Sequence, residues 1–65
     1  MEILGAMQTP DGQWRVETVR QRDQEWLQVV HEGVAIQFLS LESARAILKK
    51  AGVDWAELVP VERLT

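Results

Sequence analysis

The sequence predicts an α+β fold: a four-stranded antiparallel β-meander, one amphipathic α-helix packed on one face of the sheet, and a short C-terminal helix or arm. Two observations predict it. Four short segments are separated by turn residues: the first, at about 2–8, is mostly apolar, and those at about 13–20, 25–31 and 34–39 are rich in β-branched and aromatic residues. Helical spacing of apolar residues begins only after them. Since no helix is available to cross between the strands, we expect antiparallel pairing.

The first two segments form a predicted hairpin around residues 9–12, which read Thr-Pro-Asp-Gly. Proline presets the φ angle of a turn, and Gly12 can adopt the left-handed conformation that follows. In the next segment Trp14 and Val16 alternate with Arg15, as expected for a strand with one buried face. A bulge at Gly12 would slip the pairing by one residue, so the register of this hairpin stays open.

The third and fourth segments form a second predicted hairpin, reached through an exposed polar loop at residues 21–24 and closed by a two-residue turn at residues 32 and 33. With this turn, residue 27 opposes residue 38, and the side chains sort onto two faces. The first face, predicted to hold the helix, carries Leu27, Val29, Ile36 and Phe38. The second carries Trp26, Val30, Ala35 and Leu39 around the pair Gln28 and Gln37.

The predicted helix spans about residues 41–51, where apolar side chains recur every three or four positions. Ser40 is placed to cap its first turn, and Gly52 to end it in the left-handed conformation. A further element at about 54–64 starts with Asp54 as a predicted N-cap. Pro60 limits any helix there, so this element is either a short helix or an extended arm.

Size and composition predict a single domain over residues 1–65 that needs good packing or a partner to be stable. The hydrophobic content of 46% argues against disorder, and the absence of cysteine excludes disulfides and thiolate metal sites. No apolar run reaches the ~20 residues of a membrane span, and no signal peptide is recognisable. We therefore expect a cytoplasmic protein without a membrane partner.

No arrangement of residues indicates catalysis, a cofactor or a metal. His31 has Glu25 and Glu32 near it in sequence, but no nucleophile or second histidine accompanies it. The glycines are dispersed and form no phosphate-binding loop. We therefore expect a protein that is not an enzyme, with no catalytic, cofactor-binding or metal-binding residues.

The apolar excess instead predicts a small non-catalytic interaction module, an adaptor or regulator that forms a homodimer or binds another protein. One helix covers one face of a sheet, so the second face is left without a cover. Aromatic side chains in an uncovered patch are typical anchors of protein interfaces. The predicted interface residues are Trp14, Trp26, Val30, Leu39 and Trp55. Alternatively, residues 53–64 fold back over this face within the monomer.

A second hypothesis is a nucleic-acid-binding regulator. Arginines beside aromatic residues on an open sheet could hold DNA or single-stranded nucleic acid by phosphate pairing and base stacking. The predicted contacts are Arg15, Arg20 and Arg22, extended by Lys49 and Lys50. The net charge of −3 argues against broad electrostatic binding of this kind.

Overall fold

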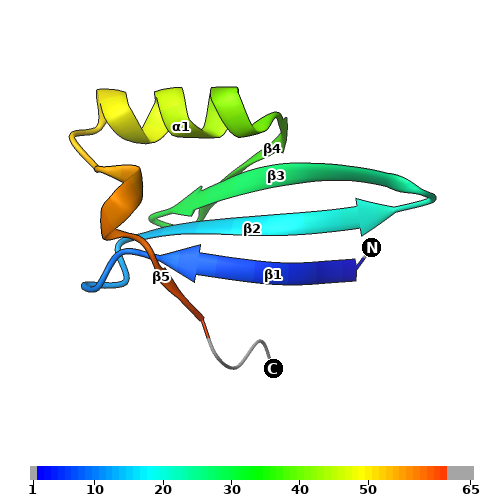
Figure 1. Ribbon diagram of the computed structural model, residues 1–65, viewed down its shortest axis with the longest axis horizontal. Coiled ribbons are helices and arrows are strands. Elements are labelled where there is room, and N and C mark those ends of the chain that lie inside the picture. Colours follow the sequence, from blue (N-terminus) through cyan, green and yellow to red (C-terminus); the bar gives the residue numbers. More distant parts are fainter. Residues whose placement is uncertain (1, 62–65) are drawn as a thin grey trace.

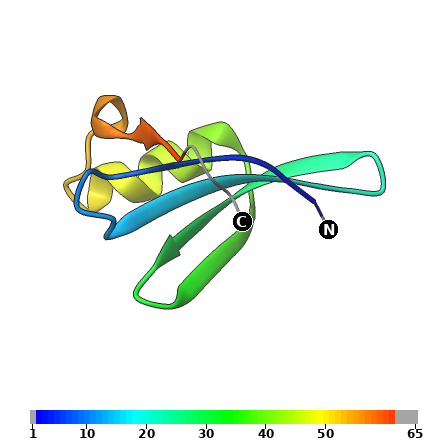
Figure 2. The same ribbon diagram turned by 90° about the horizontal axis from the view of Figure 1, so that it is seen from below.

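The structure, a computed structural model, describes residues 2–61 and has the α+β architecture that the sequence predicts. Its elements are β1 (Glu2–Gln8), β2 (Trp14–Gln21), β3 (Gln24–His31), β4 (Val34–Leu39), α1 (Leu41–Lys50), the 3₁₀ turn η1 (Trp55–Glu57) and β5 (Val59–Pro60). The strands form one antiparallel sheet in the order β4-β3-β2-β1-β5. Helix α1 lies on one face of this sheet (Figure 1). Seen at 90°, the sheet is twisted, and β4 lies well away from β1 (Figure 2).

The centre of the sheet is the β2–β3 hairpin, which pairs without interruption from Trp14 with His31 to Gln21 with Gln24. The prediction of an exposed loop at residues 21–24 is wrong in its extent, because only Arg22 and Asp23 form the turn. Both have positive φ angles, 52° and 66°, as a type I′ turn requires. This turn geometry matches the right-handed twist of the two strands, so the hairpin closes tightly.

The β1–β2 turn is held by side chains, as its sequence predicts. Thr9 donates its hydroxyl to the Asp11 carboxylate at 2.6 Å, and the Gln13 N–H donates to the same carboxylate oxygen at 3.0 Å. Gly12 has a φ of 73°. The register that the sequence left open pairs Gln8 with Arg15 and Met7 with Val16, and it shifts by one residue at a bulge at Leu4, at the far end of the hairpin from Gly12.

Helix α1 begins and ends where its sequence signals predict. The Ser43 N–H donates to the Ser40 hydroxyl at 3.1 Å, and Gly52 follows the helix with a φ of 82°. Ala44 and Leu48 of α1 are fully buried. They pack against Val16 of β2 and Val29 of β3 in one core cluster. Seven half-buried side chains surround this cluster: Trp14, Leu27, Leu39, Ile47, Val53, Trp55 and Leu58.

The β3–β4 hairpin differs from its predicted register near its open end. Val29 opposes Ile36 as expected, but Leu27 opposes Leu39 rather than Phe38. The extra residue is a bulge, in which Phe38 adopts a left-handed φ of 61°. Phe38 therefore leaves the helix-covered face and is 72% exposed, whereas Leu39 packs against the core. The prediction that Phe38 supports the helix and Leu39 lies on the open face is wrong for this reason.

The C-terminal segment combines the two predicted alternatives, a short helical turn and then an extended arm. The Ala56 N–H donates to the Asp54 carboxylate at 3.0 Å, so Asp54 caps η1 as predicted. Strand β5 pairs with the end of β1, and the Val61 N–H donates to the Ala6 carbonyl at 3.0 Å. This segment packs on the helix side and edge of the sheet, and residues 62–64 of the predicted arm lie outside the described residues.

Replacing Leu48 by alanine is expected to destabilise the fold by about 2–5 kcal/mol, because Leu48 is fully buried at the centre of the core. Urea unfolding followed by circular dichroism measures this change. The matched control is Leu41→Ala on the same helix, where the side chain is 53% exposed and a change within about 0.5 kcal/mol is expected. Equal decreases in the free energy of unfolding for Leu48→Ala and Leu41→Ala would contradict the packing described.

The stability contributed by Asp11 is expected to depend on acid pH. The hydrogen bond from Thr9, and then that from the Gln13 N–H, lower the pKa of Asp11 below its ordinary value of 3.8. A lowered folded-state pKa means that the contribution is present above pH 3.8 and disappears as pH falls through the folded pKa. Asp11→Asn should therefore lower the melting temperature at pH 7, and this decrease should become progressively smaller below pH 3.8.

Thermal unfolding of both proteins across a pH series tests this expectation. Asp23→Asn is the control, because the Asp23 carboxylate accepts no hydrogen bond within residues 2–61 and lies in the other tight turn. A melting-temperature difference for Asp11→Asn that stays constant down to strongly acid pH would contradict the assigned role.

Candidate interaction surface

The sheet face opposite α1 carries three rows of side chains that run across the strands: an apolar row, a polar middle row and a third row with Arg15 and Val30. Next to the β2–β3 turn, an apolar row is formed by Ile3, Val19, Trp26 and Phe38. Ile3 and Trp26 flank Val19 on neighbouring strands, and Val19 is fully buried between them. The Trp26 and Phe38 rings lie 4.8 Å apart, centroid to centroid. Phe38 at 72% and Ile3 at 39% exposure leave the two ends of this row open to solvent.

The middle row is polar and divides the face. Gln28 donates its amide N–H to the carboxylate of Glu17, and Gln37 donates to the Gln28 carbonyl oxygen at 3.4 Å. Arg15 places its Nε 3.1 Å from Glu17 Oε2, without hydrogen-bond geometry. Glu17 and Gln28 are only 8% and 6% exposed. A buried carboxylate in this position depends on the donors around it.

Strand β4 is the most open of the four long strands. Its residues are exposed except for Leu39, which is half-buried, and none is charged. Val34 and Ile36 are 63% and 42% exposed on the helix-covered face, and Phe38 projects from the other. We call these three side chains the β4 surface. They stand at a sheet edge that no other described strand covers.

An apolar groove of about 240 Å³ runs beside the β4 surface, between β4 and α1. Its walls include Val34 and Ile36 on β4 and Ile47 on α1, with Trp14 and Val29 below them. It exists because the ten residues of α1 pack mainly over β3 and leave the outer strand partly uncovered. Apolar side chains therefore continue from the groove to the free edge.

The structure divides the five predicted interface residues between the core and the open face. Trp26 and Val30 lie on the open face, as predicted. Trp14, Leu39 and Trp55 instead pack around the core cluster. The β4 surface is not predicted from the sequence, because the alternating pattern places Ile36 and Phe38 in contact with the helix. Its only sequence signal is that residues 34–39 carry no charge.

His31 is engaged in packing rather than placed beside a nucleophile. Its ring stacks on Trp14 with centroids 3.8 Å apart and 4° between the planes. The Nδ1 atom lies 2.7 Å from the Gln13 carbonyl oxygen, which can only accept, so Nδ1 carries the proton. Of the two predicted neighbours, Glu32 lies 3.7 Å from Nε2, while Glu25 lies on the other end of β3, opposite Arg20.

The five cations of the nucleic-acid hypothesis do not share one surface. Arg15 lies on the open face beside Glu17, whereas Arg20 lies on the other face and pairs with Glu2 at 2.7 Å. This ion pair raises the pKa of Arg20. Arg22 is in the β2–β3 turn next to Arg20. Lys49 and Lys50 end α1, at the opposite end of the molecule from that turn (Figure 1).

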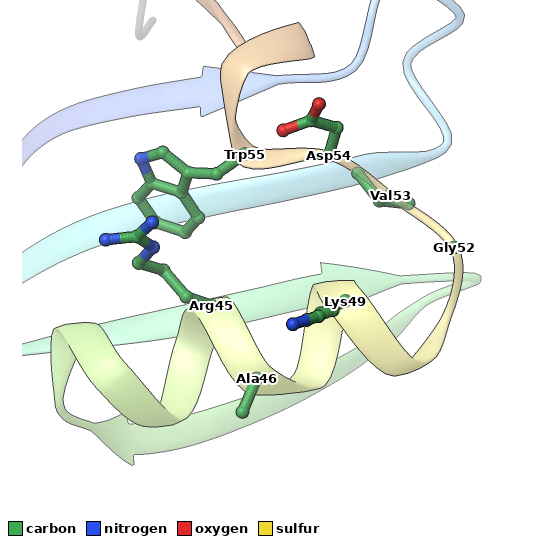
Figure 3. A pocket seen from close by; sticks show the side chains of 7 residues that line it. All are labelled: Arg45, Ala46, Lys49, Gly52, Val53, Asp54 and Trp55. Carbon is green, nitrogen blue, oxygen red and sulfur yellow. The ribbon is translucent and has the colours of Figure 1, made fainter.

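Lys49 instead belongs to a groove of about 420 Å³ at the end of α1. The Arg45 guanidinium carbon lies 5.9 Å from the centre of the Trp55 ring, within the range of a cation–π contact. Figure 3 shows Arg45 and Lys49 one helical turn apart, with the Asp54 carboxylate directed away from both. The Arg45 contact holds Trp55 against the helix.

Within residues 2–61, no group of three or more histidine and carboxylate side chains is arranged to hold a metal ion. None of the helices in this part of the chain has the length and apolar character needed to cross a membrane. Comparisons of the chain with protein-family models, curated proteins and solved structures found no match.

Removing the amide of Gln28 tests the polar row. Gln28→Leu is expected to lower the free energy of unfolding by about 1–3 kcal/mol, because the buried Glu17 carboxylate loses its donor. Glu17→Leu in the same background should recover part of that loss, since both partners are then apolar. Gln37→Leu, at the exposed end of the row, is the control and should change stability by less than about 0.5 kcal/mol. Chemical unfolding of the four proteins measures these differences, and a neutral Gln28→Leu would contradict the assignment.

Proposed function

We propose that this chain is a small non-catalytic interaction module that self-associates through its apolar sheet surface and serves as an adaptor or regulator. The observation that carries the proposal is the β4 surface. Val34, Ile36 and Phe38 are all exposed, uncharged and contiguous with an open sheet edge. Large apolar side chains exposed on both sides of one strand are typical of interaction sites, and open strand edges are pairing sites unless they are protected.

The backbone at Phe38 supports the proposal. A bulky residue with a left-handed φ of 61° is an outlier that costs roughly 1–3 kcal/mol. Within the described residues this cost brings Phe38 only one ring contact, with Trp26, while 72% of the residue stays in water. The bulge also places Leu39 against the core, which offsets part of this cost. A partner that buries Phe38 would offset more of it.

The size of the core also favours association. Within residues 2–61 the buried apolar side chains are Val16, Val19, Val29, Ala44 and Leu48, of which Leu48 is the largest. A domain of this length removes only roughly 60% of its unfolded surface from water, and small folds gain stability from oligomerisation. Burying the β4 surface against a second copy would enlarge the apolar interior.

Sedimentation equilibrium over a range of protein concentrations tests the proposal, with Phe38→Gly as the decisive variant. Glycine adopts the φ of residue 38 without strain, so the folding stability of the monomer should be unchanged or higher. The dissociation constant of the dimer should rise at least about tenfold, since aromatic anchors dominate interface energies. Val59→Ser is the control, because Val59 is similarly apolar and 42% exposed but lies at the opposite edge of the sheet.

Two outcomes would overturn the proposal. One is a chain that stays monomeric up to high micromolar concentration. The other is an association that Phe38→Gly and Val59→Ser weaken equally, since the β4 surface would then have no special part in it.

A further inference from the structure

We infer that the partner on the β4 surface is a second copy of this chain, docked edge to edge, with β4 of each copy paired antiparallel. The two five-stranded sheets then become one continuous sheet. The inference rests on the proposed function and specifies its geometry. Strand addition of this kind uses backbone hydrogen bonds for affinity and side-chain contacts for register.

The two edges of the sheet are unequally protected, and this selects β4. At the β1 edge, β5 already pairs with Met7 and Gln8, and Pro60 has no N–H to offer a further strand. The rest of β1 carries the bulge at Leu4 and the charged Glu2. Charges, prolines and bulges are the usual devices that block edge pairing. Residues 34–37 of β4 have none of them.

The backbone of β4 offers hydrogen-bonding groups at this edge. Glu32 and Gly33 have φ angles of 51° and 79°, so the β3–β4 turn is a two-residue type I′ turn. In such a hairpin His31 and Val34 form the hydrogen-bonded pair next to the turn. Pairing alternates from there, so Ala35 directs its N–H and carbonyl away from β3, toward solvent. By the same alternation the N–H and carbonyl of Gln37, the last residue before the bulge, also point away from β3.

The side chains of β4 are complementary to themselves. In an antiparallel pair, a residue whose backbone groups point toward the neighbouring strand opposes a residue whose backbone groups also point toward it. When two copies of residues 34–37 pair about a two-fold axis, the axis therefore passes through Ala35 or Ile36. In both registers Val34 and Ile36 of the two copies gather on the helix-covered face. There they extend the apolar groove that Trp14 and Ile47 line in each copy.

Charge also favours a second copy over an acidic or basic partner strand. Residues 34–39 carry no charged side chain, so two copies of β4 meet without like-charge repulsion. The nearest carboxylate, Glu32, would stand opposite residues 38–40 of the partner subunit, which are uncharged. The bulge at Phe38 ends the ladder on each side, so the interface is short and its population depends on protein concentration.

Cross-linking through single cysteines tests the geometry, because the natural chain contains none. In either register, the two copies of residue 36 lie within about 8 Å of each other, at most two residues apart along paired strands. Ile36→Cys should therefore give a covalent dimer with a short bis-maleimide. The matched control is Ala46→Cys, on the exposed side of α1, which should give little cross-linked dimer at the same concentration.

Ala35→Pro tests the hydrogen bonds. Proline removes an N–H that does not bond β3, so the hairpin should keep its circular dichroism spectrum and melting temperature while the dissociation constant rises at least tenfold. If this variant does not fold, Ile36→Lys replaces it. The residue is 42% exposed in the monomer, and in the dimer two ammonium groups would meet across the edge.

The outcomes separate this inference from the proposed function. A strictly monomeric chain overturns both. A dimer that is weakened by Phe38→Gly, but gives no preferential cross-link at Ile36→Cys and tolerates Ala35→Pro, overturns only the edge pairing. Such a dimer would be joined through the open sheet face instead. Preferential cross-linking at residue 36 together with the loss of association in Ala35→Pro is the result we expect.

Discussion

The packing of Ala44 and Leu48 on Val16 and Val29 is the contact on which the rest of the structure depends. It is the place where the helix meets the two central strands and excludes water from them. Because α1 has only ten residues, this contact places the helix over the middle of one face of the sheet. The helix therefore covers β4 only in part and leaves the opposite face open, and both surfaces keep apolar side chains in contact with solvent. The candidate interaction surface is thus a consequence of where the core lies.

The bulge in β4 links the core to that surface. A regular strand would place Phe38 under the helix and turn Leu39 outward, since side chains alternate between faces. One extra residue reverses both assignments, so Leu39 completes the core while Phe38 joins Trp26 on the open face. The strained backbone of Phe38 and its exposure are two aspects of the same local rearrangement. Strain at an exposed aromatic side chain is the kind of outlier that suggests a functional contact.

The opposite face of the sheet carries an apolar row and a polar row of side chains next to each other. The apolar row buries Val19 without any help from the helix, because Ile3 and Trp26 flank it on the neighbouring strands. The polar row beside it keeps Glu17 satisfied through Gln28 and interrupts the apolar surface. This interruption limits how much of the face can bind an apolar partner. The most exposed apolar side chains therefore lie along β4, with Val34 and Ile36 on the helix-covered face and Phe38 on the other.

Local signals in the sequence determined most of the fold: the four long strands, the turn at residues 9–12, the type I′ turn at 32–33, the helix and its Ser40 cap. These features depend on residues close together in the chain, so periodicity and turn chemistry reveal them. The tight turn at Arg22 and Asp23 and the bulge at Phe38 were not predictable in this way, because neither arginine nor phenylalanine favours a positive φ. Their conformations follow from pairing along the whole of β2 and β3 and from the space under α1 for Leu39. The sequence alone therefore determined that an apolar excess exists, with Trp26 and Val30 on the open face. Only the tertiary structure decided that its most exposed part is β4, because the position of the helix and one bulge select which side chains stay in water.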